Sequence, residues 1–466
     1  MSVPRTRSGA ARMAAAAVFA LFATAGCGRG SGPSASDEIN VLLVVIDTAG
    51  AEHMGYELPD LGHTPNIDRL ARDGVLFTRA YSPAPWTQPA VASLFTSRMP
   101  SRHGVLRLFD VLDEEHTTMA EWFEERGFRT AGVISHMLLE SRYGYAQGFE
   151  SWDATPVGGH DAITSHAVTD RAIRWLDRHD RSAPFFLFVH YFDPHFAYWH
   201  HPEFRLTGDY RGPVRPGMGI WELREARERL GPEDLRYLVA LYREEIAYTD
   251  HHIGRLLDHL RRRQLDGETL VIVTADHGEE FMRHGWIGHT RTLYDELLRV
   301  PFVMRLPGGP EGRVVETPVS LLDVLPTLMA LAGEPADPAA EGRSLLPWLG
   351  AKAPAPAARE LRAEVSFASR PEDPAALSQK TAFKTAWLRP DLKLIHDLVE
   401  DRFELYDRST DPEELRDLSG AHPAEAELRA ALLAWERTRE ARGVERPGLQ
   451  PSPEELERLR ALGYLR

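Results

Sequence analysis

The 466-residue chain has a single cysteine, Cys27. An intrachain disulfide is therefore excluded, and a folded domain must rely on a hydrophobic core. After residue 25 the chain also lacks an apolar run long enough to span a membrane as a helix. With 43% hydrophobic and 26% charged residues, the composition is that of an ordinary globular protein. The length allows one large α/β domain and a smaller one.

The chain also has fewer basic than acidic residues. The chain has 54 Lys and Arg residues against 69 Asp and Glu residues, which gives a formal net charge of −15. Nucleic acid is not expected as a partner, because binding its phosphates needs clustered positive charge. A small anionic substrate remains compatible with this composition, since a bound cation can reverse the local field.

The N-terminal segment has the pattern of an export signal. Several arginines precede a short apolar run, residues 13–25, which is too short for a comfortable membrane span. Small residues then lead to Cys27, as in bacterial lipoprotein signals, although Thr24 stands where Leu is usual. We predict a lipoprotein-type signal peptide over residues 1–27, lipidated at Cys27, with ordinary secretion as the alternative. The protein would be exported and anchored to the bacterial envelope, in the periplasm or at the cell surface.

Composition shifts divide the rest of the chain. Residues 28–38 are rich in Gly and Ser and are typical of a flexible tether. A Pro/Ala-rich stretch later in the chain is typical of a linker. The predicted units after the tether are a catalytic domain over 39–334, the linker over 335–358 and a C-terminal subdomain over 359–466. In that subdomain, residues 361–406 alternate weakly like a small antiparallel sheet, and charged runs at 423–442 and 453–462 are typical of surface helices.

The catalytic segment alternates between buried strands and helices. Strands are expected at 39–46, 75–80, 130–134, from 184, 269–274 and 299–305, and helices at 64–73, from 87, from 118, 160–180, 232–262 and 320–331. This alternation predicts an α/β fold with a large, mostly parallel sheet sandwiched by helices. Together with the segment after the linker, it predicts a smaller C-terminal α+β subdomain.

Thr87 stands between a Pro-rich approach and an Ala-rich helical run. A hydroxyl at a helix N-terminus faces free N–H groups and the positive end of the macrodipole, which favour an anion. One interpretation is that Thr87 is a metal-activated nucleophile. The other is that Thr87 only caps the helix.

Three of the predicted strands end in an aspartate: Asp47, Asp193 and Asp276. Ligand chemistry in α/β folds lies at the carboxyl ends of the strands, although a single Asp there also opens turns. Three such residues, together with Thr87, His277 and His289, predict a metal centre. Oxygen ligands suit Ca²⁺, Mg²⁺ or Mn²⁺, and added imidazoles shift the preference towards Zn²⁺ or Mn²⁺.

At these residues the sequence resembles the sulfatase family of the alkaline phosphatase superfamily, over roughly residue 39 to the end. The stretches that carry the resemblance, in family order, are Asn40–Asp47, His63–Leu70, Ala84–Ser93, Ala275–Glu279, Thr292–Pro301, Asp323–Leu328, Gly342–Leu346 and Glu404–Asp407. The resemblance implies the fold of that superfamily and a divalent metal ion.

The family's roles can be carried over to matching residues. Asp47 matches the first metal-binding aspartate, and Asp276 with His277 matches the pair that closes the metal site. Thr87 matches the nucleophile and also touches the metal. His195 resembles a histidine that contacts the transferred group. His289 stands where relatives place a substrate-binding lysine or a ligand of a second metal, to which Asp193 would contribute.

The departures from the family pattern point away from its usual chemistry. Sulfatases convert a Cys or Ser within Cys/Ser-x-Pro-Ser/Ala-Arg to formylglycine, and here the matching residues are Thr87 to Val91. Threonine cannot become formylglycine, so none is expected, and Val91 replaces the motif arginine. A further element, Gly-Lys-Trp-His, is absent, and His136 is assigned to substrate binding in its place.

The sequence therefore predicts a metal-dependent hydrolase of sulfate or phosphate esters that uses an unmodified Thr87. The metal would be Ca²⁺, or Zn²⁺ or Mn²⁺ in a two-metal site. The substrate would be a small anionic ester, free or linked to a glycan or lipid. The alternatives are a transferase of phospho-head-groups in the envelope and a catalytically silent binding protein.

Overall fold

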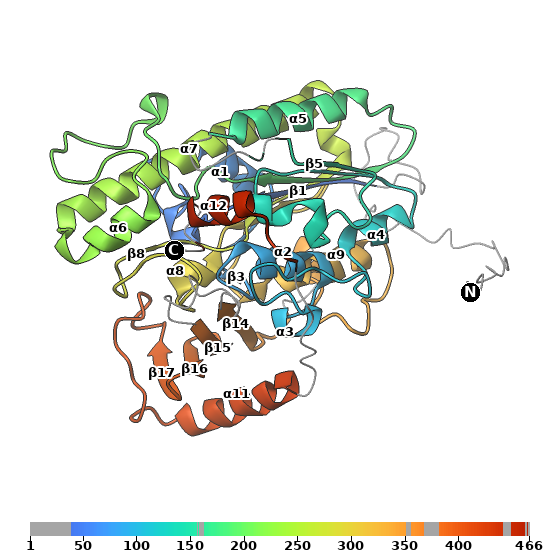
Figure 1. Ribbon diagram of the computed structural model, residues 1–466. Coiled ribbons are helices and arrows are strands. Elements are labelled where there is room, and N and C mark those ends of the chain that lie inside the picture. The colour runs from blue at the N-terminus through green and yellow to red at the C-terminus, as the bar shows by residue number, and fades with distance from the viewer. Residues whose placement is uncertain are drawn as a thin grey trace.

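The computed structural model describes residues 39–155, 157, 163–350, 356–367, 382–440, 449–461 and 464. The predicted signal peptide, Cys27 and the tether lie outside the described residues, as does part of the linker. Figure 1 shows a large α/β domain with a smaller sheet and helix beside it. No helix within the described residues is both long and apolar enough to cross a membrane.

An eight-stranded sheet forms the centre of the large domain. Its spatial order is β12 (Arg313–Val315), β2 (Val75–Phe77), β11 (Phe302–Arg305), β7 (Thr269–Ala275), β1 (Asn40–Ile46), β6 (Phe185–Tyr191), β4 (Arg129–Val133) and β5 (Ser151–Asp153). The central strands β1, β6 and β7 are parallel and buried along their whole length. Their continuous apolar runs suit a sheet that is covered on both faces. The prediction of a large, mostly parallel sheet is confirmed.

Two predicted strands are interrupted. The run at 299–305 becomes β10 (Arg299–Val300) and β11, because Pro301 between them has no N–H to donate to a ladder. β11 runs antiparallel to β7 and β2. The run at 75–80 becomes β2 and β3 (Ala80–Tyr81), and β3 pairs in a separate sheet with β10 and β13 (Val319–Ser320).

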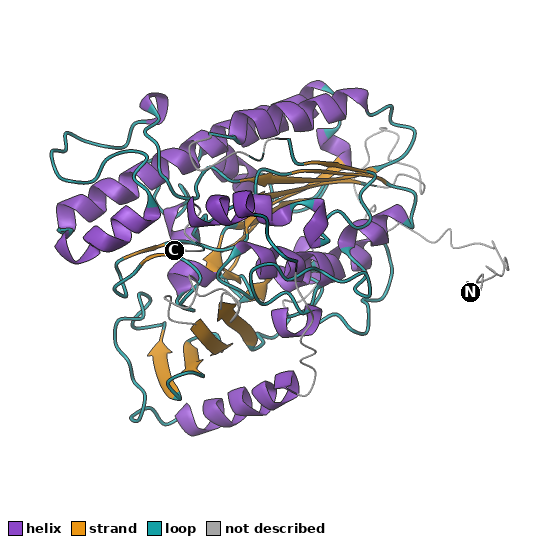
Figure 2. Cartoon of the chain, viewed as in Figure 1, coloured by secondary structure: helices purple, strands orange, loops and turns teal. Residues whose placement is uncertain are grey.

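Helices cover both faces of the sheet (Figures 1 and 2). α1 (Pro65–Arg72), α5 (Ser165–Arg178) and α7 (Pro232–Arg262) pack on one face. α2 (Thr87–Thr96), α4 (Met119–Glu124) and α9 (Val324–Leu331) pack on the other. The helix predicted at 232–262 is confirmed as α7. The remaining elements of this domain are β8 (Glu280–Phe281), β9 (Ile287–Gly288), α3 (Pro100–His103), α6 (Ile220–Ala226), α8 (Asp295–Leu298) and α10 (Leu346–Leu349).

Two of these helices differ from an ordinary amphipathic, capped helix. All ten residues of α2 are buried, rather than one face alone. Small Ala and Thr side chains let this helix be enclosed between the sheet and its neighbours. Thr64 does not cap α1. Its hydroxyl accepts from the Gly55 N–H and donates to Asp68. It therefore accepts no capping hydrogen bond from a backbone N–H of the first turn of α1.

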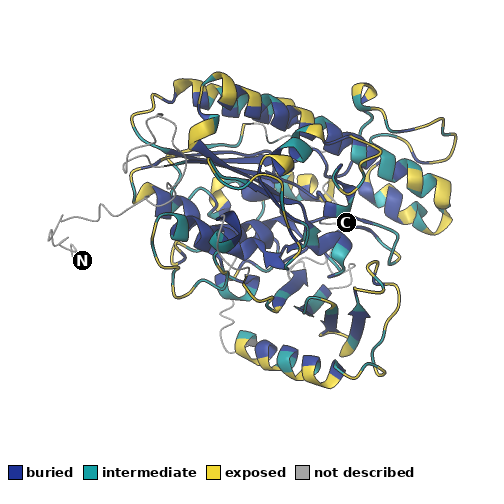
Figure 3. Ribbon diagram, turned by 180° about the vertical axis from the view of Figure 1, so that it is seen from behind, coloured by how far each residue is buried: buried dark blue, intermediate teal, exposed yellow. Residues whose placement is uncertain are grey.

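The C-terminal sheet is antiparallel, as expected. It contains β14 (Leu361–Phe367), β15 (Ala382–Leu388), β16 (Leu392–Asp397) and β17 (Arg402–Asp407). α11 (Glu425–Glu440) packs on it. Buried leucines of the sheet and helix form a cluster together with Met99 and Leu322 of the large domain. Figure 3 colours the buried parts of the chain dark blue. The last helix, α12 (Pro453–Ala461), contacts the large domain instead: Trp221 Nε1 donates to the Arg460 carbonyl at 3.0 Å.

Candidate active site

Three ligand groups meet at the carboxyl edge of the central strands. Asp47 follows β1, and Asp276 and His277 follow β7, so parallel pairing brings the three residues together. Nε2 of His277 lies 3.6 Å from Oδ1 of Asp47 and 3.6 Å from Oδ2 of Asp276. Ligands that share one cation lie about 3–4 Å apart, given metal–ligand bonds of about 2.0–2.6 Å. The three side chains therefore form one candidate metal centre.

The protonation of His277 suits a metal ligand. Its Nδ1 donates to the carbonyl oxygen of Gly278 at 2.9 Å. Burial lowers the pKa of His277 to about 4, which leaves the ring neutral near pH 7. Nε2 then carries a lone pair, which faces the carboxyl groups of Asp47 and Asp276. A cation at that point would satisfy all three groups.

The charge balance of the site also calls for a cation. Asp47, Asp276 and Glu279 are buried carboxyl groups within one region. Burial and the charges of Asp276 and Glu279 raise the pKa of Asp47 well above its ordinary value. Burial raises the pKa of Glu279 to about 8. Among the described residues, neither oxygen of Asp47 nor Oδ2 of Asp276 accepts a hydrogen bond. These residues fit a divalent ion, whose positive charge would balance the negative charge of the buried carboxylates.

Thr87 is the first residue of α2 and is completely buried. Trp86 occupies the N-cap position. Thr87 is therefore not the helix cap of the second interpretation. Its Oγ1 lies 3.4 Å from Nε2 of His277, which places the hydroxyl beside the candidate metal ligands. A helix N-terminus stabilises negative charge on that oxygen.

His289 lies beside this centre. Its Nδ1 donates to Oε1 of Glu279 at 2.9 Å, and Oε2 of Glu279 accepts from the Tyr198 hydroxyl at 3.0 Å. Burial lowers the pKa of His289 to about 3. The ring centroid lies 4.6 Å from that of His277. Glu279 therefore fixes the orientation of a neutral imidazole at the edge of the site.

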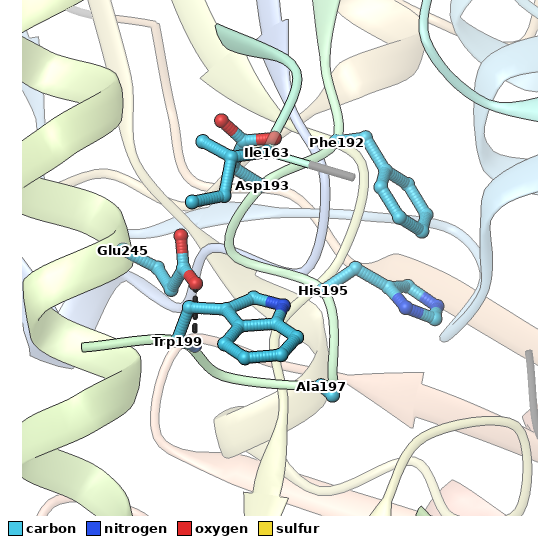
Figure 4. A pocket seen from close by; sticks show the side chains of 7 residues that line it. All are labelled: Ile163, Phe192, Asp193, His195, Ala197, Trp199 and Glu245. Carbon is cyan, nitrogen blue, oxygen red and sulfur yellow. Dashed lines mark hydrogen bonds between the residues drawn. The ribbon is translucent and has the colours of Figure 1, made fainter. Parts of the chain in front are cut away.

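His195 lies on the other side of His289. The two ring centroids are 5.0 Å apart, and Nδ1 of His195 donates to the Phe196 carbonyl at 3.0 Å. His195 also lines a small pocket together with Ile163, Phe192, Asp193, Ala197, Trp199 and Glu245 (Figure 4). His195 thus connects the candidate metal centre with this pocket.

Asp193 is not brought to the three converging ligands. Its Oδ1 accepts from the N–H and hydroxyl of Thr164, and its Oδ2 accepts from the N–H of Ser165, all at 2.6 Å. These bonds hold the first turn of α5. In Figure 4 the Asp193 carboxylate and the His195 ring point in different directions. The local structure therefore gives Asp193 a structural task that the sequence did not indicate.

His136 lies under the candidate metal centre. Its Nδ1 accepts from the Leu138 N–H at 3.0 Å, so the proton of the neutral ring is on Nε2. Nε2 lies 3.7 Å from Oδ2 of Asp47. Burial lowers the pKa of His136 well below its ordinary value. His136 therefore supports Asp47 as well as facing the site.

The sequence analysis did not single out three residues near this centre. His190 lies on β6 with Nε2 3.9 Å from Oδ2 of Asp47. The signal was an imidazole within an apolar strand, where it has no packing role. Glu279 directly follows a matched motif. Tyr464 comes from the far C-terminus, and its hydroxyl lies 3.4 Å from Nε2 of His136. Nothing local in the sequence indicated that position.

Sequence models of two families match the chain. The model described as Sulfatase matches residues 39–334, which is more than half of the chain. The model described as N-sulphoglucosamine sulphohydrolase, C-terminal, matches residues 282–437. The chain belongs to the sulfatase family of the alkaline phosphatase superfamily, as the sequence motifs predicted.

The proteins similar to this chain include named sulfatases and a named phosphonate monoester hydrolase. The sulfatase YidJ of Escherichia coli (strain K12) is 27% identical over 81% of this chain and 82% of its own. The N-acetylglucosamine-6-O-sulfatase of Bacteroides thetaiotaomicron is 23% identical over 82% of each chain. The structure of the phosphonate monoester hydrolase of Agrobacterium radiobacter aligns with a TM-score of 0.69 at 23% identity, over 89% of this chain and all of that one. By family, the protein is a hydrolase of ester bonds.

Proposed function

We propose that the protein is a metal-dependent hydrolase that cleaves sulfate or phosphate esters through an unmodified Thr87. One observation carries this proposal. The Thr87 hydroxyl lies 3.4 Å from the His277 nitrogen whose lone pair faces Asp47 and Asp276. Nucleophile and candidate metal ligands therefore share one buried site, with no cysteine or serine in the nucleophile's place.

Asp47, Asp276 and His277 would hold one divalent ion, with Thr87 beside it. When bound, the ion lowers the pKa of the hydroxyl and neutralises charge on the transferred group. His289 and Asp193 were also considered as ligands of a second ion. The hydrogen bonds of Asp193 to α5 favour a site with one ion.

The chemical sequence follows from the residues around Thr87. The Thr87 hydroxyl gives up its proton to solvent, its oxygen forms a bond to sulfur or phosphorus, and the bond from that atom to the leaving-group oxygen breaks as that oxygen takes a proton from His195. Water then gives one proton to His195 and attacks the same atom. The bond from that atom to the Thr87 oxygen breaks, which releases the inorganic acid, and Thr87 regains a proton from solvent. Splitting the reaction in this way replaces one difficult step by two easier ones.

His195 is suited to the proton transfers. Because its Nδ1–H is committed to the Phe196 carbonyl, the exchangeable proton resides on Nε2. In its charged form Nε2 can donate to the leaving-group oxygen, and in its neutral form it can accept a proton from the attacking water. His289, held by Glu279, and His136 would orient the ester.

The substrate that fits this site is a small anionic ester, free or attached to a glycan or lipid. The name of the Bacteroides relative points to sulfated sugars, and that of the Agrobacterium relative points to phosphonate monoesters. Thr87 favours the phosphorus side, since the two-metal branch of the superfamily, which includes phosphodiesterases and phosphoethanolamine transferases, uses an unmodified Thr or Ser. The purified enzyme, loaded in turn with Ca²⁺, Mn²⁺ and Zn²⁺, should be assayed on an aryl sulfate, an aryl phosphate, a phosphodiester and a phosphonate monoester. Hydrolysis of none of them would refute the proposal.

We also propose that the protein is exported and lipid-anchored through Cys27. Metabolic labelling with a radioactive fatty acid tests this directly. The wild-type protein should carry label and sediment with membranes, and Cys27→Ala should lose the label. An unlabelled wild-type protein, recovered in the soluble exported fraction, would indicate ordinary secretion instead.

A further inference from the structure

Tyr464, two residues from the C-terminus, lies inside the candidate active site. Its side chain is only 1% exposed. Its ring neighbours, at centroid distances of 5.9–6.4 Å, are Trp86, His136, His195, His289 and Phe367. Three of these neighbours are the histidines expected to contact substrate. The phenol therefore belongs to the same enclosed space as Thr87.

The position of Tyr464 is built by contacts along α12. Leu459 of this helix is completely buried, and the Tyr464 N–H donates to its carbonyl at 3.0 Å. Arg142 pairs with Glu455, which is largely buried. The Trp221 indole donates to the Arg460 carbonyl. Several independent contacts thus direct the end of the chain back to the large domain.

The hydroxyl of Tyr464 is oriented as a donor. His136 carries its proton on Nε2, because its Nδ1 accepts from Leu138. At 3.4 Å this Nε2–H points its proton at the phenol oxygen, which acts as acceptor. The hydrogen of the phenol is then left for another oxygen. Burial raises the pKa of Tyr464 well above its ordinary value. The phenol stays protonated near pH 7.

Several groups around Thr87 offer no hydrogen-bond donor to an anion. Asp47, Asp276 and Glu279 are acids, and His277 presents a lone pair. Val91 stands where the family motif has an arginine. A transferred group with several anionic oxygens needs hydrogen-bond donors as well as a cation. A neutral phenol can supply one without adding charge.

We propose that Tyr464 is a substrate-binding residue of this enzyme, and that its hydroxyl donates a hydrogen bond to an oxygen of the transferred sulfuryl or phosphoryl group. The assignment rests on the proposed function. Thr87 is completely buried in the structure, so the ring must yield space when the ester enters. The hydroxyl then donates its hydrogen bond to the ester.

Tyr464→Phe tests the assignment because it keeps the ring and removes only the hydroxyl. The loss of one hydrogen bond to a charged group should lower kcat/KM about ten- to a hundredfold. Tyr406→Phe is the matched control. It removes a buried phenol that bonds Glu404 in the C-terminal sheet, and it should keep wild-type kcat/KM.

A second measurement does not depend on turnover. Calorimetry on the Mn²⁺-loaded protein gives the Kd of inorganic sulfate, phosphate and vanadate. Tyr464→Phe should weaken the preferred oxyanion about tenfold or more, with metal affinity and Tm close to wild type. Unchanged oxyanion Kd and kcat/KM would overturn the assignment. A higher kcat/KM together with a lower oxyanion Kd, in Tyr464→Phe or after removal of residues 462–466, would also overturn it and show that Tyr464 only obstructs the site.

The two proposals fail in different ways. If the wild-type enzyme hydrolyses none of the esters, or Thr87→Ala retains wild-type turnover, the proposed function fails. The oxyanion titration still decides whether Tyr464 contacts the anion. If turnover requires Thr87 but is indifferent to the Tyr464 hydroxyl, only the assignment of Tyr464 fails.

Discussion

The hydroxyl oxygen of Thr87 lies 3.4 Å from Nε2 of His277, although 190 residues separate the two in the sequence. α2 brings the hydroxyl, and the end of β7 brings the imidazole. The parallel sheet then adds Asp47 from β1. This contact places a nucleophile against a set of metal ligands, and the predictions below follow from it.

Thr87→Ala should lower turnover by about four orders of magnitude or more, as expected when a nucleophile is removed. Bound metal should be retained, because Asp47, Asp276 and His277 remain. Thr96→Ala makes the same change at the other end of α2, where the hydroxyl bonds only the Ala92 carbonyl. Thr96→Ala should keep its activity in the same ester assay. Residual turnover of Thr87→Ala near the wild-type rate would place the nucleophile elsewhere.

Asp276→Asn should lose metal and activity together, because it removes a charge from the three-ligand set. Metal content is measured by elemental analysis after reconstitution and desalting. Asp250→Asn is the control: Asp250 is equally buried, but its carboxylate bonds Asn66 and Ile67 at the start of α1. If Asp276→Asn kept full metal content, the metal would have to bind at other residues.

Asp193→Ala distinguishes between one and two ions. The structure predicts an unchanged metal content of one ion per chain. Three buried hydrogen bonds to α5 are lost, so the free energy of unfolding should fall by about 1–3 kcal/mol. Denaturant unfolding and elemental analysis on the same samples give both values. A second ion in the wild-type protein that disappears in Asp193→Ala would establish a two-metal site.

Glu244 should make stability depend on pH. It lies on α7 and accepts from the backbone N–H groups of His201, Leu206 and Thr207 and from Nδ1 of His200. Burial would raise the pKa of Glu244, but these bonds outweigh burial and the pKa is lowered from 4.5.

Because the folded-state pKa is the lower one, the contribution of Glu244 is fully present above the unfolded-state pKa and is lost as pH falls below 4.5 through the folded-state value. Glu244→Gln should therefore be less stable than wild type by about 1–3 kcal/mol at pH 7. The difference in unfolding free energy between wild type and Glu244→Gln should become smaller as pH falls below 4.5. Urea unfolding at a series of pH values measures this difference in unfolding free energy. A difference that grows as pH falls below 4.5 would contradict the account.

Much of the metal centre could be predicted from sequence because its parts obey local rules. A buried apolar strand that ends in a polar residue is visible in one dimension. Parallel pairing then forces Asp47 and Asp276 to the same edge. The start of α4 just after Thr118 and the span of α7 were predictable for the same reason, since both depend on neighbours in sequence.

The rest depended on tertiary contacts. The position of Tyr464 is set by α12 packing on the large domain, and the sequence indicated only a solvated surface helix there. Asp193 looked like Asp47 and Asp276 at a strand end, but α5 supplies donors that occupy its oxygens. His190 pointed into the site from within an apolar strand, where sequence alone could not separate it from a core residue.

The most direct test of the central claim is to trap the covalent intermediate on Thr87. The metal-loaded enzyme is mixed with the best aryl ester, quenched in acid during the first turnover and digested for mass spectrometry. The account predicts a sulfuryl or phosphoryl group on Thr87, on an otherwise unmodified threonine, and no such adduct in Thr87→Ala. An adduct on another residue, or turnover that continues in Thr87→Ala, would contradict it.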